Sequence, residues 1–280
     1  MSYAICNETF EGWEHQRICE CIARLGYRGL EVAPFTLSSQ PTLWPTAERQ
    51  RFRAIAEAAD IQIIGLHWLL ARTTGYHLTH PHAAIRQQTA QYLADLGKLC
   101  HDLGGSLMVL GSPQQRNRLP EVTPAQAFEY ALDTLKQTMP RLGELGVRLC
   151  LEPLGTAETN FINTCAEGMQ LVKAVDHPLC VLHLDVKAMA AECNTMDDGL
   201  AIARLIQEYI ASAGHFHAND PNRRGPGFGA MPFRPIMKAL QTARYAGWVS
   251  VEVFDYTPDP ETIARESLRN MQLALPTATT

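Results

Sequence analysis

The chain alternates short apolar segments with longer segments whose apolar residues recur every three or four positions. The apolar segments are eight in number and span residues 3–6, 28–32, 61–68, 106–110, 147–152, 180–185, 215–218 and 248–253. A short apolar run followed by helical periodicity is typical of a strand buried on both faces and of the helix that follows it. Repeated strand–helix pairs therefore predict right-handed βαβ units and a parallel sheet.

Two of the longer segments begin with residues that favour the first turn of a helix. Thr46 precedes an amphipathic segment and is the expected N-cap, because a threonine hydroxyl can accept a hydrogen bond from a free backbone N–H of the first turn. Thr123 is followed by Pro124, which combines a capping side chain with a proline at the first helical position. Both signals predict helices between the expected strands.

Eight strand–helix units in a chain of 280 residues match the size of a closed (β/α)8 barrel. We therefore predict a single TIM-barrel domain that spans residues 1–280. An open, doubly wound sheet is the alternative, but such a sheet usually has a glycine-rich turn after its first strand, and residues 6–9 (Cys-Asn-Glu-Thr) lack one. We find no linker, low-complexity tract or block of charge that would divide the chain.

Composition excludes several classes of protein. The formal net charge is -5, from 24 basic and 29 acidic residues, whereas nucleic-acid-binding domains are usually basic. No apolar run approaches the roughly 18 residues that a membrane span needs, and residues 1–8 lack the features of a secretory signal. The 8 cysteines include no CxxC motif and fit reduced, buried thiols. We expect a cytoplasmic protein with neither nucleic acid nor membrane as a partner.

In a (β/α)8 barrel the active site lies at the carboxyl ends of the strands. Nearly every predicted strand has a polar or ionisable residue at that end. These residues are Glu31, His67, Ser112, Glu152, Asp185, His217 and Glu252. Their neighbours in the sequence are mostly apolar, and side chains alternate between the two faces of a strand. One face of each strand therefore directs the polar groups toward the barrel axis.

Four of these residues come from the last four predicted strands and have the chemistry of metal ligands. Glu152, Asp185 and Glu252 supply carboxylates, and His217 supplies an imidazole. Three crowded carboxylates repel one another and lose hydration, which costs several kcal/mol per ion unless a positive charge compensates. A lone strand-end carboxylate is more often a loop anchor or half of an ion pair, but four successive strand ends favour a metal site. Carboxylate-rich ligation favours Mn²⁺, and Mg²⁺, Co²⁺ or Zn²⁺ would also fit.

Four further residues are candidates for contacting a substrate. Glu31 and His67 end earlier strands and would either touch the substrate or support other side chains by hydrogen bonds. Glu158 lies in the loop that follows the fifth strand, where the alternative is a solvated surface position. Arg223, in the loop that follows the seventh strand, would clamp an oxygen-rich substrate or remain a surface charge.

Short motifs at the predicted strand ends resemble those of a known family. They are Gly29-Leu30-Glu31-Val32, Gly65-Leu66-His67-Trp68, Gly111-Ser112-Pro113, Leu151-Glu152-Pro153-Leu154, Leu184-Asp185-Val186-Lys187, His215-Phe216-His217 and Val251-Glu252-Val253. In order and spacing, across nearly the whole chain, they resemble the xylose-isomerase-like TIM-barrel superfamily of sugar isomerases and epimerases, and most closely the ketose 3-epimerases that act on tagatose and psicose. The resemblance implies that the metal ligands are Glu152, Asp185, His217 and Glu252, and that the substrate is bound by Glu158 and Arg223.

The chain departs from that family at one position. The ketose 3-epimerases have a substrate-binding histidine three residues after the metal-binding aspartate, where this chain has Ala188. The AP endonuclease branch of the superfamily also has a histidine there, with an Asp-x-His pair further along, where Ala230 and Pro232 stand in this chain. The acidic net charge likewise disfavours a DNA substrate.

We therefore hypothesise a divalent-metal-dependent isomerase or epimerase of a sugar or polyol. Glu152 and Glu252 would remove and return a proton on carbon, through a metal-stabilised enediolate. Two alternatives remain open: a metal-dependent dehydratase of a keto-sugar or keto-inositol on the same scaffold, and a sugar-binding barrel without catalysis. The expected partner is a small-molecule sugar, and the resemblance is compatible with a homo-oligomer.

Overall fold

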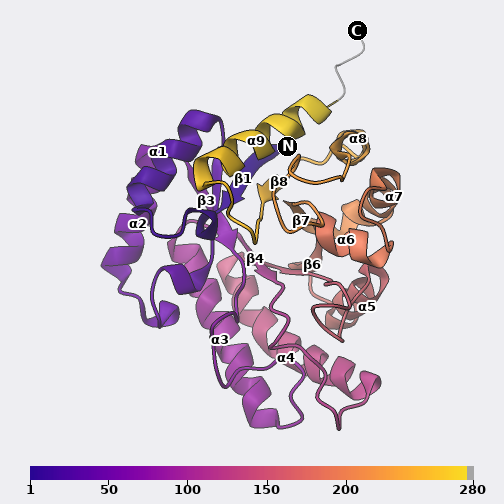
Figure 1. Cartoon of the computed structure of the whole chain (residues 1–280). Coiled ribbons are helices and arrows are strands. Elements are labelled where there is room, and N and C mark those ends of the chain that lie inside the picture. The colour runs from indigo at the N-terminus through magenta and orange to yellow at the C-terminus, as the bar shows by residue number, and fades with distance from the viewer. Residues whose placement is uncertain (276–280) are drawn as a thin grey trace.

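The computed structural model describes residues 1–275, in which eight parallel strands close into a barrel in the order of the sequence (Figure 1). The strands are β1 (Ser2–Cys6), β2 (Gly29–Val32), β3 (Gln62–Leu66), β4 (Leu107–Leu110), β5 (Arg148–Leu151), β6 (Cys180–Asp185), β7 (Ala213–Ala218) and β8 (Trp248–Val251). β1 pairs with β2 and, closing the barrel, with β8. The predicted (β/α)8 barrel is confirmed. The predicted domain spanned residues 1–280. Its last five residues, 276–280, lie outside the described residues.

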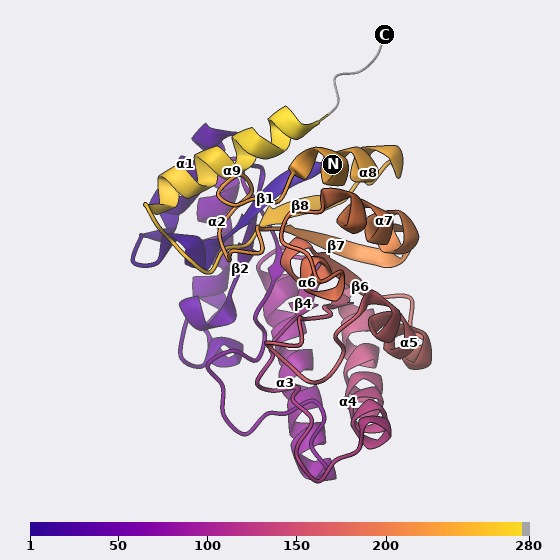
Figure 2. The same ribbon diagram turned by 45° about the vertical axis from the view of Figure 1, so that its right-hand side comes forward.

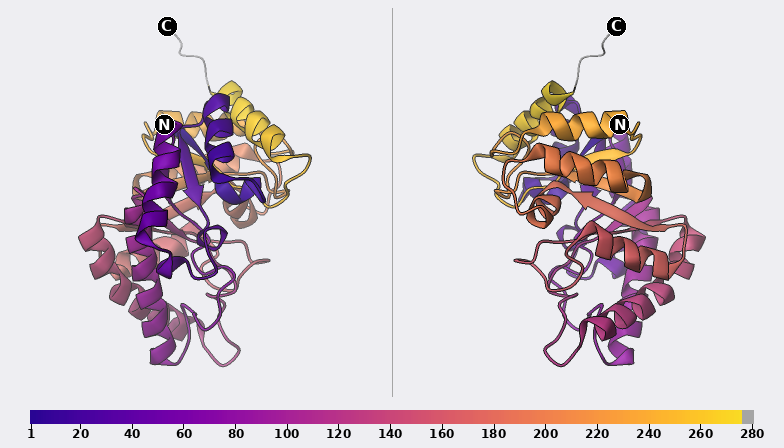
Figure 3. Two further views of the ribbon diagram at one scale, coloured as in Figure 1. Left: turned by 90° about the vertical axis from the view of Figure 1, so that its left-hand side faces the viewer. Right: turned by 90° about the vertical axis from the view of Figure 1, so that its right-hand side faces the viewer.

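The helices surround the barrel and follow one another in sequence order, from α1 and α2 on the left of Figure 1 to α9 at its top. They are α1 (His15–Leu25), α2 (Thr46–Ala58), α3 (Ala83–Asp102), α4 (Pro124–Leu145), α5 (Cys165–Val175), α6 (Val186–Glu192), α7 (Gly199–Tyr209), α8 (Phe233–Thr242) and α9 (Pro260–Ala274), with short 3₁₀ helices at Asn7–Phe10, Pro34–Thr36, Pro41–Leu43 and Ile210–Ser212. In Figures 2 and 3, α3 and α4 lie side by side and reach further from the barrel than the other helices. The last helix, α9, contacts both α1 and α8 and so covers the closure between β1 and β8.

Local chemistry decides where the individual elements begin and end. Thr123 caps α4 as predicted, because its hydroxyl accepts from the backbone N–H of Gln126 at 3.2 Å and the Gln126 side chain accepts in return. The prediction that Thr46 caps α2 is wrong: Pro45 occupies the N-cap in an extended conformation, and Thr46 is the first helical residue. β3 ends two residues before Trp68, because Trp68 adopts φ 51°, a left-handed conformation that a strand cannot continue.

The interior of the barrel changes from apolar to polar along its axis. Leu107, Val109 and Cys150 form a small buried apolar cluster on the inward face of the strands. Toward the carboxyl ends of the strands, the inward positions are ionisable and fully buried: Glu31, His67, His183, His215 and His217. Buried ionisable groups are stable only when partners compensate them, so the polar end of the barrel has to be organised by specific contacts.

The cysteines are where the sequence led us to expect them. All eight are free thiols; seven are buried, and Cys193 is partly exposed. Among residues 1–275, no helix combines the length and the apolar character that crossing a membrane would require.

Candidate active site

The structure brings the four predicted metal ligands together at the polar end of the barrel. Asp185 ends β6 and His217 lies in β7, while Glu152 and Glu252 directly follow β5 and β8. Each side chain offers one ligand atom, these atoms all lie within 4.8 Å of one another, and all four side chains are buried. Four successive strands converge in this way because their inward positions share one face of a closed sheet.

The electrostatics of this cluster fit a divalent cation. Burial raises the pKa of Glu152 well above its ordinary value, and the charges of Glu252 and Asp185 raise it further. Burial also raises the pKa of Asp185, to about 6. Burial acts in the same direction on Glu252, but the neighbouring His217 outweighs it and lowers the pKa of that carboxyl. Buried carboxylates with raised pKa values, as in Glu152 and Asp185, can be stabilised in their charged form by a bound cation.

His217 is oriented to present one nitrogen to the cluster. Its Nε2 lies 3.1 and 3.2 Å from the two carboxylate oxygens of Glu31, which also accepts from Nε2 of His215 at 2.8 Å. Its Nδ1 has no hydrogen-bond partner among residues 1–275 and lies 3.2 Å from Glu252 Oε2. If Nε2 carries the proton and donates to Glu31, the lone pair of Nδ1 faces the cluster. A carboxylate behind an imidazole in this way is the usual support of a histidine that binds a metal.

Glu31 and His67 both lie deeper in the barrel than the cluster, and neither borders the chamber of about 480 Å³ that covers the cluster. Glu31 is fully buried against two imidazoles. His67 is also fully buried and bridges two carboxylates, with Nε2 2.9 Å from Glu8 Oε2 and Nδ1 3.3 Å from Glu252 Oε1. Of the two alternatives for these residues, these positions favour support of other side chains over contact with a substrate.

Asp185 is held by two hydrogen bonds that the sequence did not indicate. Its Oδ1 accepts from the backbone N–H of Ala188 at 2.7 Å, which makes Asp185 the N-cap of α6. Its Oδ2 accepts from the amide of Asn219 at 2.6 Å. Asn219 also accepts from the backbone N–H of Lys187 at 2.9 Å, so it connects the loop after β7 to the start of α6. Two bonds of this kind leave the carboxylate of Asp185 a single orientation.

A buried arginine connects the ends of β4 and β5. The guanidinium of Arg116 donates to the carbonyl oxygen of Glu152 at 2.6 Å and to the carbonyl oxygen of Leu110. Burial lowers the pKa of Arg116 to about 10. The backbone from which the Glu152 side chain projects is therefore fixed by Arg116.

Removal of this arginine should destabilise the protein. We expect Arg116→Met to lower the free energy of unfolding by about 2 kcal/mol, because the buried carbonyl oxygen of Glu152 loses the guanidinium donor and that of Leu110 keeps only the backbone N–H of Glu152, at 3.2 Å. Urea unfolding followed by circular dichroism measures the change. Arg141→Met is the matched control, since Arg141 is exposed in α4 and should change stability by at most about 0.5 kcal/mol. Equal stabilities of the two variants would contradict the assignment.

A chamber of about 480 Å³ lies over the cluster, and both Glu152 and Glu252 border it. The stacked rings of Trp68 and Phe254, with centroids 5.6 Å apart, form one wall. The predicted substrate-binding residues Glu158 and Arg223 border the same chamber. The structure therefore places these two candidates, unlike Glu31 and His67, where a substrate could reach them.

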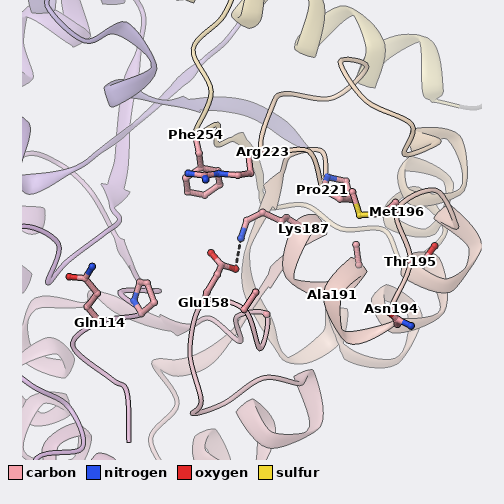
Figure 4. Close-up of a pocket in the computed structure, with 14 residues that line it drawn as sticks. Gln114, Glu158, Lys187, Ala191, Asn194, Thr195, Met196, Pro221, Arg223 and Phe254 are labelled. Carbon is pink, nitrogen blue, oxygen red and sulfur yellow. Dashed lines mark hydrogen bonds and ion pairs between the residues drawn. The ribbon is translucent and has the colours of Figure 1, made fainter. Parts of the chain in front are cut away.

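Lys187 is a further residue of the site that sequence reasoning did not single out. Its ammonium lies 2.6 Å from Glu158 Oε2 and 5.1 Å from the ring centroid of Phe254. Figure 4 shows this ion pair between Gln114 on one side and the segment that contains Met196 on the other. The only signal in the sequence was a lysine two residues after the predicted ligand Asp185, which is too common a feature to indicate a site.

The raised pKa of Asp185 has a consequence for stability that depends on pH. The folded protein binds a proton here more tightly than the unfolded chain, so this group's contribution to stability falls as pH rises from about 4 to about 6. A divalent cation should relieve that cost at pH 7.5, whereas protons compete with it at pH 5. We expect Mn²⁺ to raise the melting temperature clearly at pH 7.5 and far less at pH 5, as measured by differential scanning fluorimetry.

The matched variants for this measurement are Asp185→Asn, which should lose most of the stabilisation at pH 7.5, and Asp95→Asn, which should keep it. Asp95 is exposed on α3, far along the chain from the cluster. An equal effect of Mn²⁺ at both pH values, or in both variants, would contradict the prediction.

Known proteins resemble this chain in sequence and in fold. Residues 19–274 match the family described as xylose isomerase-like TIM barrel. The chain is 28% identical over 253 residues to D-psicose 3-epimerase of Agrobacterium fabrum, and this match covers 86% of this chain and 82% of the relative. It is 27% identical over 254 residues to D-psicose 3-epimerase of Ruminiclostridium cellulolyticum, and this match covers 90% of this chain and 82% of the relative. The solved structure of D-psicose 3-epimerase with D-tagatose from Clostridium cellulolyticum H10 has a TM-score of 0.81 at 23% identity and covers 99% of this chain and 100% of that one. The chain belongs to the xylose isomerase-like TIM barrel family.

Proposed function

We propose that the protein is a divalent-cation-dependent epimerase of a ketose. The observation that supports this most strongly is the position of Glu152 and Glu252: both are buried, both border one chamber, and their ligand atoms lie within 4.8 Å of each other. They project from strands that are three apart around the barrel, so they approach the chamber from different sides. Two carboxylates placed in this way suit the removal of a proton from one face of a carbon and its return to the other.

The two carboxylates differ in how tightly they hold a proton. Burial and neighbouring negative charge raise the pKa of Glu152, whereas His217 lowers the pKa of Glu252. Environments that push two pKa values apart assign the roles of acid and base. Glu252 would therefore take the proton from carbon while Glu152 donates one. In the reverse reaction the two exchange roles.

The remaining residues hold the reacting groups in place. Asp185 and His217 would complete the ligand set with Glu152 and Glu252, and a divalent cation held there, which we propose to be Mn²⁺, would supply Lewis-acid stabilisation of the enediolate. Glu158 and Arg223 would orient the sugar by hydrogen bonds from the chamber wall.

The comparisons support the choice of reaction. Two relatives, each matched by this chain over 82% of its own length, bear the name D-psicose 3-epimerase. A third relative is 22% identical to this chain, is matched over 91% of its length, and bears the name fructoselysine 3-epimerase. Each name describes inversion at carbon 3 of a ketose or ketose derivative. We propose the same inversion for this chain.

Proton exchange at carbon 3 tests the proposal. The protein loaded with Mn²⁺ is incubated with a panel of ketohexoses in D₂O and followed by ¹H NMR. We expect the signal of the carbon 3 proton to disappear while a 3-epimer appears, and EDTA to stop both. Loss of water from the substrate would show a dehydratase instead, and absence of any exchange would show a binding protein; either result would overturn the proposal.

A further inference from the structure

The guanidinium of Arg223 borders the chamber, but no polar partner within residues 1–275 fixes its position. It forms neither a hydrogen bond nor an ion pair there, and it lies 5.7 Å from the ring centroid of Phe254, as Figure 4 shows. In the proposed function this group orients the sugar. Its place in the chamber therefore depends on how the backbone of the loop that carries it is held.

The backbone of Arg223 is held by hydrogen bonds on both sides of its α-carbon. Arg223 has φ 73°, in the left-handed region, and its N–H donates to the carbonyl oxygen of Asp220 at 2.8 Å. Its own carbonyl oxygen accepts from the backbone N–H groups of Phe254 at 2.9 Å and Asp255 at 3.1 Å. A non-glycine residue persists in this region only where its surroundings hold it. These bonds attach the loop that follows β7 to the segment that follows β8.

Asp220 organises the loop of residues 220–231 from inside. It is only 1% exposed, and its carboxylate accepts two backbone N–H groups: Oδ1 accepts from Asn222 and Oδ2 from Met231, each at 3.2 Å. The backbone N–H of Asp220 donates to the carbonyl oxygen of Arg224 at 2.7 Å. Asp220 is therefore bonded to both chain neighbours of Arg223, and its carboxylate joins the start of the loop to its end.

The glycine-rich half of the loop is held by other contacts. A Cβ placed on Gly225 would overlap Oγ of Ser267, and one placed on Gly227 would overlap the side-chain amide of Asn270. Ser267 and Asn270 both lie in α9, so this half of the loop packs closely against that helix. Loss of the Asp220 carboxylate should therefore act mainly on residues 220–224, which include Arg223.

We propose that Asp220 is a positioning residue for the epimerisation, because its buried carboxylate fixes the left-handed turn that directs the guanidinium of Arg223 into the chamber. Asp220 does not itself border the chamber, so it acts on a substrate through Arg223. The inference rests on the proposed function, in which Arg223 orients the sugar. It adds the residue on which that orientation depends.

A double-mutant cycle between Asp220 and Arg223 tests the inference. We measure kcat/KM, for a ketose that shows exchange at carbon 3, in the wild type, Asp220→Ala, Asp220→Asn, Arg223→Met and the variant that combines Asp220→Ala with Arg223→Met. Asp220→Ala should lower kcat/KM by about tenfold, since a small misplacement of a binding group is costly, and Arg223→Met should lower it by at least as much. Asp220→Asn keeps one acceptor oxygen and should lose less than Asp220→Ala. In the Arg223→Met background, Asp220→Ala should cost less than about threefold, because the group that it positions is gone.

A variant that weakens the fold elsewhere separates positioning from general loss of stability. Thr123→Ala removes the capping hydroxyl of α4 and should lower the melting temperature by about 2 °C. Thr123 does not border the chamber, so kcat/KM should stay within about twofold of the wild type. Hydrogen–deuterium exchange followed by mass spectrometry adds a readout that does not depend on turnover. Asp220→Ala should speed exchange in residues 220–224, and Thr123→Ala should not.

The possible results separate failure of the inference from failure of the proposed function. Equal losses from Asp220→Ala in both backgrounds would show that Asp220 acts independently of Arg223. That result, unchanged kcat/KM in Asp220→Ala, or unchanged exchange in residues 220–224 would overturn the inference and leave the proposed function standing. If Arg223→Met epimerises as the wild type does, the role of Arg223 in the proposed function fails, and the inference fails with it. If no ketose undergoes exchange at carbon 3, the proposed function and the inference both fail.

Discussion

Replacing Glu152 or Glu252 with glutamine should lower kcat for epimerisation by about 10³-fold, because each variant removes one of the two groups that exchange a proton with carbon. Glutamine keeps the shape of the side chain but cannot take up or release a proton at neutral pH. Steady-state kinetics at saturating Mn²⁺ measures the loss, and the melting temperature shows whether the fold is retained. Glu144→Gln is the matched control, since Glu144 is exposed in α4.

Isotope exchange separates the roles of the two carboxylates. In D₂O, a variant that keeps one carboxylate should exchange the carbon 3 proton of one epimer and not of the other, and the two variants should show opposite preferences. This selectivity follows if each carboxylate serves one face of the substrate. Exchange of both epimers at wild-type rates in either variant would contradict the assignment of Glu152 and Glu252 as the proton-transferring pair.

A single methyl group at Gly111 should disable the site without a large effect on the fold. Gly111 follows β4, and a Cβ placed on it would overlap Oε2 of Glu152. The carboxylate of Glu152 is the far end of a flexible side chain, so it is displaced by rotation of that side chain, while Arg116 keeps the backbone to which it is attached in place. We expect Gly111→Ala to lower kcat/KM by about 10²-fold, since a displacement of about 1 Å at a reacting group can cost that much.

A second glycine provides the control for this variant. Gly143 lies in α4, and a Cβ placed there would come no closer than 3.1 Å to any neighbour, the nearest being the ring of His177. Gly143→Ala should therefore leave kcat/KM within about twofold of the wild type. A crystal structure of Gly111→Ala that shows Glu152 in its original position, together with unchanged metal affinity and unchanged activity, would contradict the argument.

The barrel and its four convergent side chains could be predicted because they depend on regular structure. Eight strand–helix repeats determine the closed sheet, and the alternation of side chains along each strand determines which residues face inward. The regular structure therefore brings together four side chains without depending on the conformation of the loops: Glu152, Asp185, His217 and Glu252. The same alternation placed Glu31 and His67 inside the barrel but could not tell how deep they lie.

The rest of the site depends on loops and could not be read from the pattern. Arg116 reaches the carbonyl groups of residues 6 and 36 positions away, and Asn219 contacts a carboxylate 34 positions away. The pair between Lys187 and Glu158 spans 29 positions. Long polar side chains have many orientations, and which one is populated depends on the packing of segments that have no periodic signal. Contacts of this kind become visible only in three dimensions.

Binding of Mn²⁺ to the metal-free protein tests the central claim most directly. Titration at pH 7.5, followed by electron paramagnetic resonance, should show about one tightly bound ion per chain, and binding should weaken by about 10²-fold or more in Asp185→Asn and in His217→Gln. The exposed-site variant Asp95→Asn should bind as the wild type does. No bound Mn²⁺ in the wild type, or equal binding in all four proteins, would contradict the assignment of these four side chains as a metal site.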